Sequence, residues 1–320
     1  MKRLKFIQRA LCLAVLLALC TCALAASNPR IAISCPYAAS GWVAAAAWSA
    51  ETTAEELGLN YMLKMADSAE AQAEDLELMA EKDYKYIILF PVSDEVEEAA
   101  ARAMKAGANL LCFGSIPGEL VPDESLTFDD GQLGALGAAY LGERLSGQGR
   151  VALITLASDA ASERRAAACR DALAEKYPGI EIIGTYAADS ADAETGMALM
   201  TDLLAANPQL DGVYSCDEAL STGMLRVIEA EGRLGEGGVK VLTGFGGSRA
   251  YFDLMDEYAG KIALSVQTAS PCALGELLRA CDGLAQGEGL EDATLPAETL
   301  ECEDTAAWLL RNGIAEKAPF

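Results

Sequence analysis

The sequence predicts an α/β protein with two doubly wound parallel sheets, and three observations support this class. Short apolar runs rich in β-branched residues alternate with helical patterns roughly nine times after Pro29. The runs are continuously apolar, which is typical of strands buried on both faces. Several helical patterns end in glycine, as in Leu57-Gly58, a helix C-terminal signal. This is too many units for one small sheet, so two sheets fit best, with a TIM barrel as the structural alternative.

The strands are expected wherever an apolar run is short and bounded by turn residues. The expected strands are Arg30–Ser34, Asn60–Met65, Tyr86–Phe90, Leu110–Phe113, Arg150–Thr155, Ile180–Tyr186, Gly212–Ser215, Val239–Thr243 and Ile262–Val266. Ligand sites in such sheets lie at the carboxyl ends of the strands. The residues that follow each run are therefore the first candidates for binding.

The helices are expected between these strands, where apolar residues recur at helical spacing. The expected helices are Val43–Leu57, Ala69–Lys82, Glu95–Ala106, Gln132–Leu145, Ser162–Lys176, Glu194–Ala206, Leu220–Glu231 and Pro271–Gln286. The polar, proline-containing stretch Ser115–Thr127 is expected to be a loop. We place the first passage between the two domains just after it, near Asp129–Asp130.

The amino-acid composition limits the classes of function and the partners that the protein can have. A chain of 320 residues, 52% of them hydrophobic, suffices for two domains with sizeable cores. The formal net charge of −24 makes nucleic acid and anionic lipid poor partners. The sequence contains no histidine, which excludes Ser-His-Asp and Cys-His catalysis and any histidine-ligated metal. No cofactor or metal is expected.

The first 25 residues have the layout of a secretory signal peptide. Four cations, Lys2 to Arg9, precede an apolar run that ends at Cys20, and Ala23-Leu24-Ala25 provides an A-x-A cleavage site. The run is shorter than the ~20 residues that a membrane span needs. We therefore expect export to the periplasm, with a retained membrane anchor as the weaker alternative.

Lipid attachment is a rival way of processing the same signal. Bacterial lipidation needs a small residue before the cysteine, whereas Leu19 precedes Cys20 and Thr21 precedes Cys22. Seven cysteines follow the signal, and they form no C-x-x-C pair. A bridge among Cys272, Cys281 and Cys302 stays open as a weak possibility.

Motifs in the first half are similar to those of a known family. The stretch Ala39-Ser40-Gly41-Trp42-Val43 follows the first strand, as the first ligand loop does in periplasmic sugar-binding proteins of the ribose- and galactofuranose-binding type. The segment Tyr86 to Asp94, YIILFPVSD, is similar to that family's strand-Pro-x-x-Ser/Asp segment.

Motifs in the second half follow the same family order. Ser162-Glu163-Arg164-Arg165 resembles a helix start, Asn207 to Tyr214 a turn and strand, and Cys216 to Ala219 the segment written N-D-E/D-M-A. Val241 to Phe245 resembles a V-V-G-F-D strand end, and Lys261 to Gln267 a strand that ends in glutamine. Because the matches occur in order along the mature chain, the protein is identified as a member of this family, the type I substrate-binding proteins of ABC importers.

The resemblance implies a fold and a domain division. It implies two Rossmann-like lobes joined by three crossovers, the periplasmic binding protein type I fold, closing on one ligand by a hinge motion. After the signal peptide at 1–25, the N-terminal lobe would comprise 28–129 and 268–294. The C-terminal lobe would comprise 130–267 and 295–320.

The resemblance also implies ligand-binding residues. Trp42 would be the stacking platform of the N-terminal lobe beside Ser40, and Arg165 the guanidinium fork of the C-terminal lobe. Asp217, which replaces the family's asparagine, would accept hydrogen bonds from ligand hydroxyl groups, or it would only cap a helix. Phe245 would form the bottom of the pocket, and Gln267 would hydrogen-bond the ligand.

Departures from the family pattern leave the ligand open. Gly114-Ser115 stands in place of an Asp-Arg pair, Gly246 in place of an aspartate, and Ala191 in place of an aromatic residue. The pocket is therefore expected to be roomier and less polar than that for a standard pyranose. Asp129 and Gly114 are retained as weaker site candidates.

Three hypotheses of function follow from these patterns. The first is a monomeric extracytoplasmic solute-binding protein that delivers a small, sugar-like ligand to ABC permease subunits and performs no chemistry. The second is a sensory or degenerate module of the same fold that docks on a membrane receptor or sensor kinase. The third is an exported enzyme using the paired acids Asp129-Asp130 or Asp217-Glu218, which is the weakest in a chain with 48 acids.

Overall fold

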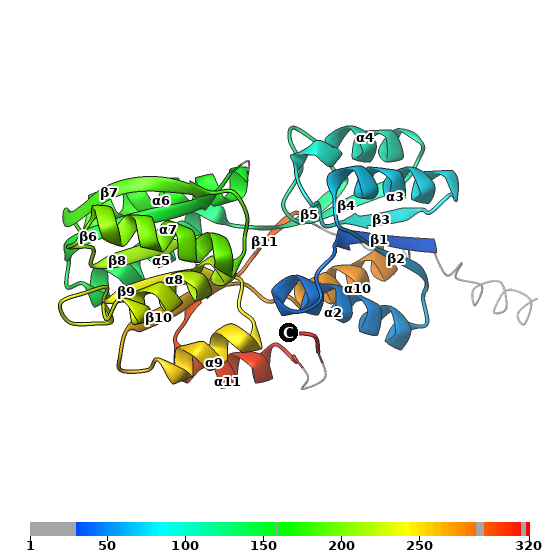
Figure 1. Cartoon of the computed structure of the whole chain (residues 1–320). Coiled ribbons are helices and arrows are strands. Elements are labelled where there is room, and N and C mark those ends of the chain that lie inside the picture. Colours follow the sequence, from blue (N-terminus) through cyan, green and yellow to red (C-terminus); the bar gives the residue numbers. More distant parts are fainter. Residues whose placement is uncertain (1–29, 158, 286–290, 315–317) are drawn as a thin grey trace, which may run out of the picture.

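The computed structural model describes residues 30–157, 159–285, 291–314 and 318–320, and the predicted signal peptide lies outside them. It contains two six-stranded sheets, one in each of two lobes that lie side by side (Figure 1). Two separate sheets exclude the TIM barrel and confirm the predicted fold class. Within the described residues, no helix has the length and apolarity needed to cross a membrane.

The sheet of the N-terminal lobe has the order β11-β5-β4-β3-β1-β2, and its paired strands are parallel. Its strands are β1 (Arg30–Pro36), β2 (Asn60–Ala66), β3 (Tyr86–Leu89), β4 (Asn109–Gly114), β5 (Glu124–Phe128) and β11 (Ala293–Leu295). The interior strands β3 and β4 are buried along almost their whole length, as their continuous apolar runs predict.

The sheet of the C-terminal lobe has the order β12-β10-β9-β8-β6-β7, and only its edge strand β12 is antiparallel to its neighbour. Its strands are β6 (Gln148–Leu156), β7 (Gly179–Ala188), β8 (Gly212–Ser215), β9 (Val241–Phe245), β10 (Ala263–Thr268) and β12 (Glu298–Leu300). The nine predicted strands are all present, and most of their ends differ by one or two residues.

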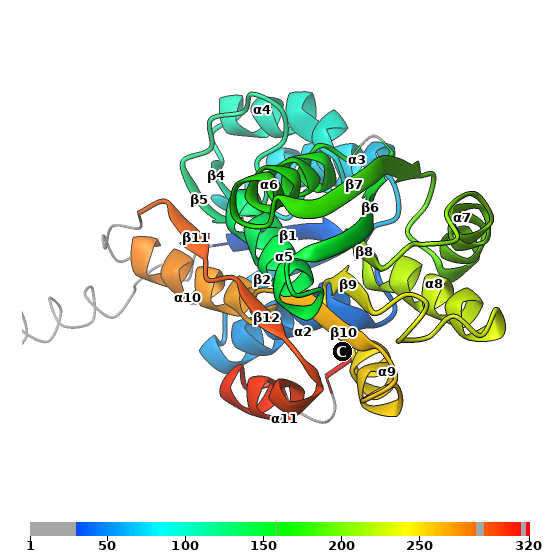
Figure 2. The same ribbon diagram turned by 90° about the vertical axis from the view of Figure 1, so that its left-hand side faces the viewer.

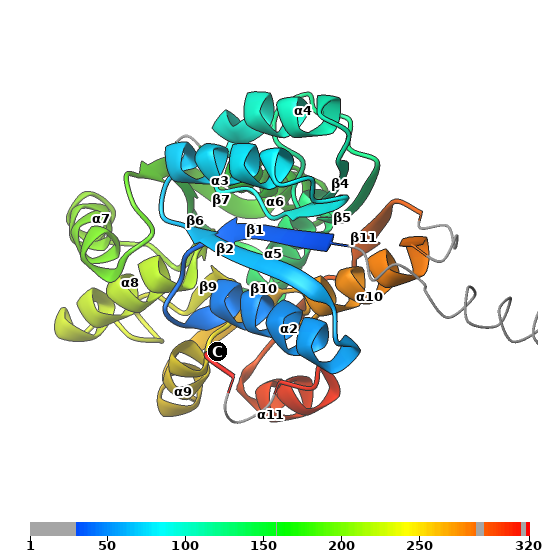
Figure 3. The same cartoon turned by 90° about the vertical axis from the view of Figure 1, so that its right-hand side faces the viewer.

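Helices cover both faces of each sheet. They are α2 (Gly41–Leu57), α3 (Ala69–Glu81), the 3-10 turn η1 (Asp94–Val96), α4 (Glu97–Lys105), α5 (Asp130–Arg144), α6 (Ala160–Lys176), α7 (Ala193–Ala206), α8 (Glu218–Ala230), α9 (Arg249–Glu257), α10 (Ala273–Ala285) and α11 (Cys302–Arg311). In the N-terminal lobe, α3 and α4 lie on one side of the sheet and α2 and α10 on the other (Figure 3). In the C-terminal lobe, α5 and α6 lie opposite α7 and α8 (Figure 2).

The chain passes between the two sheets at three places. It leaves the first sheet after β5 and enters α5, which packs on α6. It returns after β10 into α10, which packs on α2, and it crosses again between β11 and β12 (Figure 1). Three crossovers of this kind therefore join the two lobes.

Several short elements correct the sequence prediction. The stretch Ser115–Thr127 is only partly a loop, because its end forms the interior strand β5. Strands β11 and β12 and helices α9 and α11 were not predicted either. The three missed strands have only three to five residues and mixed polar sequences, so they lack the continuous apolar run that marks the others.

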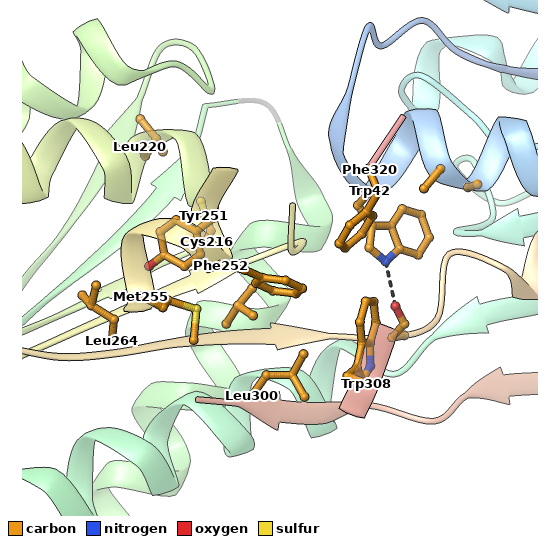
Figure 4. Packing of buried hydrophobic residues seen from close by; sticks show 14 of the residues in the cluster. Trp42, Cys216, Leu220, Tyr251, Phe252, Met255, Leu264, Leu300, Trp308 and Phe320 are labelled. Atoms are coloured by element: carbon orange, nitrogen blue, oxygen red, sulfur yellow. Dashed lines mark hydrogen bonds between the residues drawn. The ribbon is translucent and has the colours of Figure 1, made fainter. Parts of the chain in front are cut away.

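An aromatic cluster forms part of the core of the C-terminal lobe, near the second crossover (Figure 4). The rings of Phe252, Trp308 and Phe320 lie 5.5–5.9 Å apart. Trp308 is fully buried and Phe320, the last residue, is 6% exposed. The C-terminal end of the chain is therefore part of the core.

The seven cysteines after the signal segment are free thiols, so the suggested bridge among Cys272, Cys281 and Cys302 does not form. Cys281 is buried, whereas the other two are partly exposed. Burial raises the pKa of the Cys35 and Cys112 thiols to about 12. These thiols act as small core residues rather than as nucleophiles.

Candidate functional site

A cleft of about 870 Å³ lies between the two lobes, where the carboxyl ends of the parallel strands face each other. From the N-terminal lobe it is lined by Pro36, Asp67, Phe90, Pro91, Val92, Ser93, Asp94, Ser115 and Phe128. From the C-terminal lobe it is lined by Leu156, Ala157, Asp159, Ala160, Ala161, Arg164, Arg165, Asp189, Ser190, Ala191, Cys216, Asp217 and Phe245. We call this space the main cleft.

The N-terminal wall of the main cleft is largely apolar at its centre. Phe90 follows β3 directly, and Phe128 is the last residue of β5. Behind them lies Trp42, whose ring centroid is 6.1 Å from that of Phe90 and 5.3 Å from that of Phe128. The Phe113 ring is stacked with that of Trp42, with centroids 6.1 Å apart. These contacts hold Phe90 and Phe128 in a packed, well-defined position.

Trp42 therefore does not line the main cleft, although the sequence prediction made it the stacking platform. Its side chain is buried at the start of α2, with an exposed fraction of 8%. Its indole nitrogen donates a 2.7 Å hydrogen bond to the carbonyl oxygen of Ala269 in the second crossover (Figure 4). The aromatic rings of the N-terminal lobe that line the cleft are those of Phe90 and Phe128, which the prediction did not name.

Arg165 lies on the C-terminal wall, where the sequence prediction placed it. It belongs to the first turns of α6 and is only 6% exposed. Its Nε donates a 2.7 Å hydrogen bond to Oδ1 of Asp130, and its guanidinium carbon lies 3.8 Å from the ring centroid of Phe245. An ion pair and a cation–π contact thus fix the guanidinium plane in one orientation.

Asp130 is the residue that organises both arginines of this wall. Its Oδ2 accepts a 2.9 Å hydrogen bond from Nε of Arg164, the neighbour of Arg165. Because both of these bonds use Nε, the terminal nitrogens of the two guanidinium groups keep donors for a ligand among the described residues. The sequence prediction named Asp130 as a crossover residue and as one of the paired acids of the enzyme hypothesis, but not as a partner of the two arginines, since nothing local shows that α5 and α6 pack together.

Asp217 lines the main cleft and caps α8 at the same time. Its Oδ1 accepts hydrogen bonds from the backbone nitrogens of Ala219 and Leu220, at 2.7 and 3.0 Å. Burial raises the pKa of this carboxyl group above its ordinary value, against the two backbone bonds, which lower it. The second oxygen, Oδ2, has no such bond and could accept from a ligand hydroxyl.

Asp159 repeats this arrangement on α6 and was missed by the sequence prediction. Its two carboxylate oxygens accept hydrogen bonds from the backbone nitrogens of Ala161 and Ser162, at 3.1 and 3.2 Å. The signal available in the sequence was an aspartate three residues before the expected helix Ser162–Lys176, since aspartate is a preferred N-cap residue. Asp159 and Asp217 are therefore both held at helix N-termini.

Glu218 lies behind Asp217, where the two lobes meet. Its Oε2 accepts a 2.9 Å hydrogen bond from the backbone nitrogen of Gly247. A Cβ placed on Gly41, the first residue of α2, would lie 3.8 Å from its Oε1. Burial raises the pKa of Glu218 to about 7, although hydrogen bonds from Ser248 and Gly247 oppose this change.

The remaining predicted residues do not line the main cleft. Ser40 precedes α2 without a side-chain cap bond. Gln267 is 2% exposed inside the C-terminal lobe, where its Nε2 donates a 3.1 Å hydrogen bond to Oγ of Ser265. Gly114 and Asp129 line a neighbouring hollow of about 500 Å³ beside the first crossover.

The arrangement is suited to binding. The main cleft offers aromatic rings on one side and oriented hydrogen-bonding groups on the other, and Phe245 joins the two through an edge contact with Phe128, with ring centroids 5.9 Å apart. Among the residues that the structure describes, no group of three or more cysteine, aspartate or glutamate side chains could hold a metal ion.

Several solved structures share this fold. One is a periplasmic solute-binding protein of an ABC transporter from Actinobacillus succinogenes with bound D-allose, with a TM-score of 0.77 and 20% identity, covering 87% of this chain and 99% of that chain. Another is a solute-binding protein from Bacillus halodurans with bound myo-inositol, with a TM-score of 0.79 and 19% identity over 89% and 98%. A third, from Agrobacterium radiobacter in complex with D-arabinose, has a TM-score of 0.77 and 21% identity over 90% and 99%.

These identities are low, so the structural likeness establishes the fold. The sequence itself matches a family described as the periplasmic binding protein domain over residues 31–276, which is most of the chain. This match agrees with the two lobes, the three crossovers and the cleft between the sheets. The chain belongs to the periplasmic binding protein domain family.

Proposed function

We propose that this protein is the extracytoplasmic solute-binding component of an ABC importer and that it binds a carbohydrate in the main cleft. The observation that best supports this function is the pairing of two unlike walls. Phe90 and Phe128 offer apolar faces to a sugar ring, and Arg165, Asp159 and Asp217 offer oriented donors and acceptors to its hydroxyl groups.

The solved structures of the same fold support a carbohydrate ligand. They hold D-allose, D-arabinose and myo-inositol, which are neutral polyhydroxylated molecules. Five aspartates and two arginines line the main cleft, which disfavours an anionic ligand. The related structures belong to transport proteins, which supports the importer over the sensory alternative.

Closure of the lobes would complete the site. The lobes are proposed to divide at the crossovers, as 28–129 with 268–294 and 130–267 with 295–320. A ligand that touches both walls stabilises the closed state because its contacts form together only there. The signal-like segment at 1–25 supports export, so the protein would work as a monomer outside the cytoplasmic membrane and deliver its ligand to permease subunits.

Thermal unfolding in the presence of neutral sugars tests this function. D-allose, D-arabinose, D-ribose, myo-inositol and common disaccharides are added to the purified protein at millimolar concentration. A ligand at 100 times its dissociation constant contributes about 2.7 kcal/mol to the free energy of unfolding. At least one sugar should raise the melting temperature by several degrees, and no change with any of them would contradict the proposal.

A matched pair of variants locates the site. Arg165→Ala removes the fixed guanidinium group, whose hydrogen bonds are worth about 1.5–3 kcal/mol each, so the sugar-dependent rise should be lost. Arg170→Ala, on the same helix, removes an exposed arginine that bonds Thr185 and does not line the cleft. It should keep the rise. Equal behaviour of the two variants would show that the sugar binds elsewhere.

A further inference from the structure

The neighbouring hollow, which we call the hinge-side compartment, adjoins the main cleft. This compartment has a volume of about 500 Å³ and is lined by Gly114, Ser115, Ile116, Thr127, Phe128, Asp129, Asp130, Gly131, Arg164 and Thr294. Ser115, Phe128 and Arg164 line both spaces. The two spaces are therefore neighbours that share a wall, and a ligand that passes these three residues would occupy both.

Each space is large enough to hold a ring. Ligand pockets usually measure about 300–1,000 Å³ for a whole drug-sized ligand. The main cleft alone, at about 870 Å³, is near the upper end of this range. The compartment of about 500 Å³ adds room that a single sugar ring in the main cleft does not use.

Small residues lie where the two spaces adjoin. Gly114 has φ = +77°, and a Cβ there would lie 3.1 Å from ring atoms of both Phe90 and Phe128. The next residue is Ser115, which is half-buried and lines both spaces. A larger side chain at either position would press on the aromatic wall or fill the passage.

The chemistry of the compartment suits a neutral, hydroxylated ring. Hydroxyl groups come from Ser115, Thr127 and Thr294, and Ile116 supplies apolar surface. Asp129 uses Oδ1 to accept a 2.8 Å hydrogen bond from the backbone nitrogen of Gln132, which leaves Oδ2 available to a ligand.

Charge in the compartment disfavours an anionic group. Two carboxylates, Asp129 and Asp130, stand against one guanidinium group, that of Arg164. The Arg164 side chain is 57% exposed and is already paired with Asp130. A phosphate or carboxylate would therefore find little uncompensated positive charge there.

We propose that the ligand is a two-ring glycoside, with one sugar ring in the main cleft and the linked ring in the hinge-side compartment. This inference rests on the proposed function and adds the size class of the ligand. The compartment takes its walls from β5, the first crossover and β11, so the second ring would contact segments that join the lobes.

Calorimetric titration of one-ring and two-ring ligands tests the inference. The one-ring set is D-allose, D-arabinose, D-glucose and myo-inositol. The two-ring set is maltose, cellobiose, lactose and sucrose, with adenosine and uridine as glycosides whose second ring is a base. Two or more added hydrogen bonds at about 1 kcal/mol each predict that one two-ring ligand binds at least about tenfold more tightly than any single ring.

A blocking variant connects the advantage to the compartment. Thr294 is exposed at the compartment wall, so Thr294→Trp should fill the space without disturbing the core. Its neighbour Ala293 is also exposed and does not line the compartment, and Ala293→Trp is the matched control. Ile116→Trp blocks the same space from another segment if Thr294→Trp lowers the melting temperature.

The outcomes separate the two proposals. Thr294→Trp should bring the two-ring affinity down to the one-ring level and leave one-ring binding within about twofold, whereas Ala293→Trp should change neither. If single rings bind as tightly as two-ring ligands and Thr294→Trp changes nothing, the size inference is wrong and the proposed function stands. If no ligand of either set binds, both are wrong.

Discussion

The two walls of the main cleft are built on different principles. The N-terminal wall is an aromatic surface, in which Phe90 and Phe128 rest on the buried Trp42. The C-terminal wall is a polar surface, in which Arg165 is held by Asp130, and Asp217 by the N-terminus of α8. Packing fixes one wall and hydrogen bonds fix the other, so we expect them to respond differently to substitution and to pH.

The largest effect is expected at the support of the aromatic wall. Trp42→Ala removes a buried ring and the hydrogen bond to Ala269, and should lower the free energy of unfolding by about 3–5 kcal/mol. Urea denaturation measures this loss. Trp48→Ala, on the same helix but only partly buried, is the control and should cost clearly less.

One result for Trp42→Ala would contradict the view that Trp42 only supports the N-terminal wall. If Trp42→Ala kept the stability and removed only sugar binding, the indole would be a direct platform, as the sequence resemblance implied. The N-terminal wall would then have to rearrange on binding to expose a ring that is 8% exposed in this structure.

The next effect concerns pH and the half-buried carboxyl group of Glu218, beside the polar wall. Glu218 has a pKa of about 7 against an ordinary value of 4.5, so the folded state holds its proton more tightly than the unfolded state. Its stabilising contribution is full below about pH 4.5 and is lost as the pH rises to about 7, a change on the order of 3 kcal/mol.

Denaturation of Glu218→Gln between pH 4 and 8 measures this contribution. The stability of the wild type relative to Glu218→Gln should fall with rising pH and level off above about 7. Glu231→Gln, an exposed change just after the same helix, should leave the pH profile as it is. Parallel profiles for the wild type and Glu218→Gln would show that Glu218 titrates normally.

The smallest effect is expected where the two walls touch. Phe245→Leu removes the ring that faces the Arg165 guanidinium at 3.8 Å and contacts Phe128 edge-on. Loss of a cation–π contact costs about 0.5–2 kcal/mol, so sugar affinity should fall by roughly two- to thirtyfold. Phe252→Leu changes a ring of the distant aromatic cluster and should lower stability while leaving affinity within about twofold. If Phe245→Leu left sugar affinity unchanged and Phe252→Leu lowered it, Phe245 would not belong to the binding site.

The sequence was sufficient to predict the strands that have unbroken apolar runs, which burial on both faces of a sheet requires. Gly212–Ser215 has the predicted ends, and it is buried throughout. Strand β5, with the sequence ESLTF, could not be found in this way because its position beside β4 depends on long-range pairing. The same holds for β11 and β12, which gain their neighbours only when the crossovers form.

The lining of the main cleft could be anticipated only in part. Arg165, Asp217 and Phe245, which the family resemblance pointed to, do line the main cleft. Trp42 and Gln267 have similar places in the sequence, but their side chains turn into the lobes. Strand and helix patterns locate a backbone position, and the direction of a side chain there depends on packing that no local pattern records.

Small-angle X-ray scattering with and without a bound sugar tests the central claim, that one ligand bridges the two walls. A sugar that raises the melting temperature should also reduce the radius of gyration, because the lobes close on it. Arg165→Ala should show neither change at the same sugar concentration. If a sugar stabilises the protein but leaves the scattering curve unchanged, it does not bring the two walls together, and the central claim is wrong.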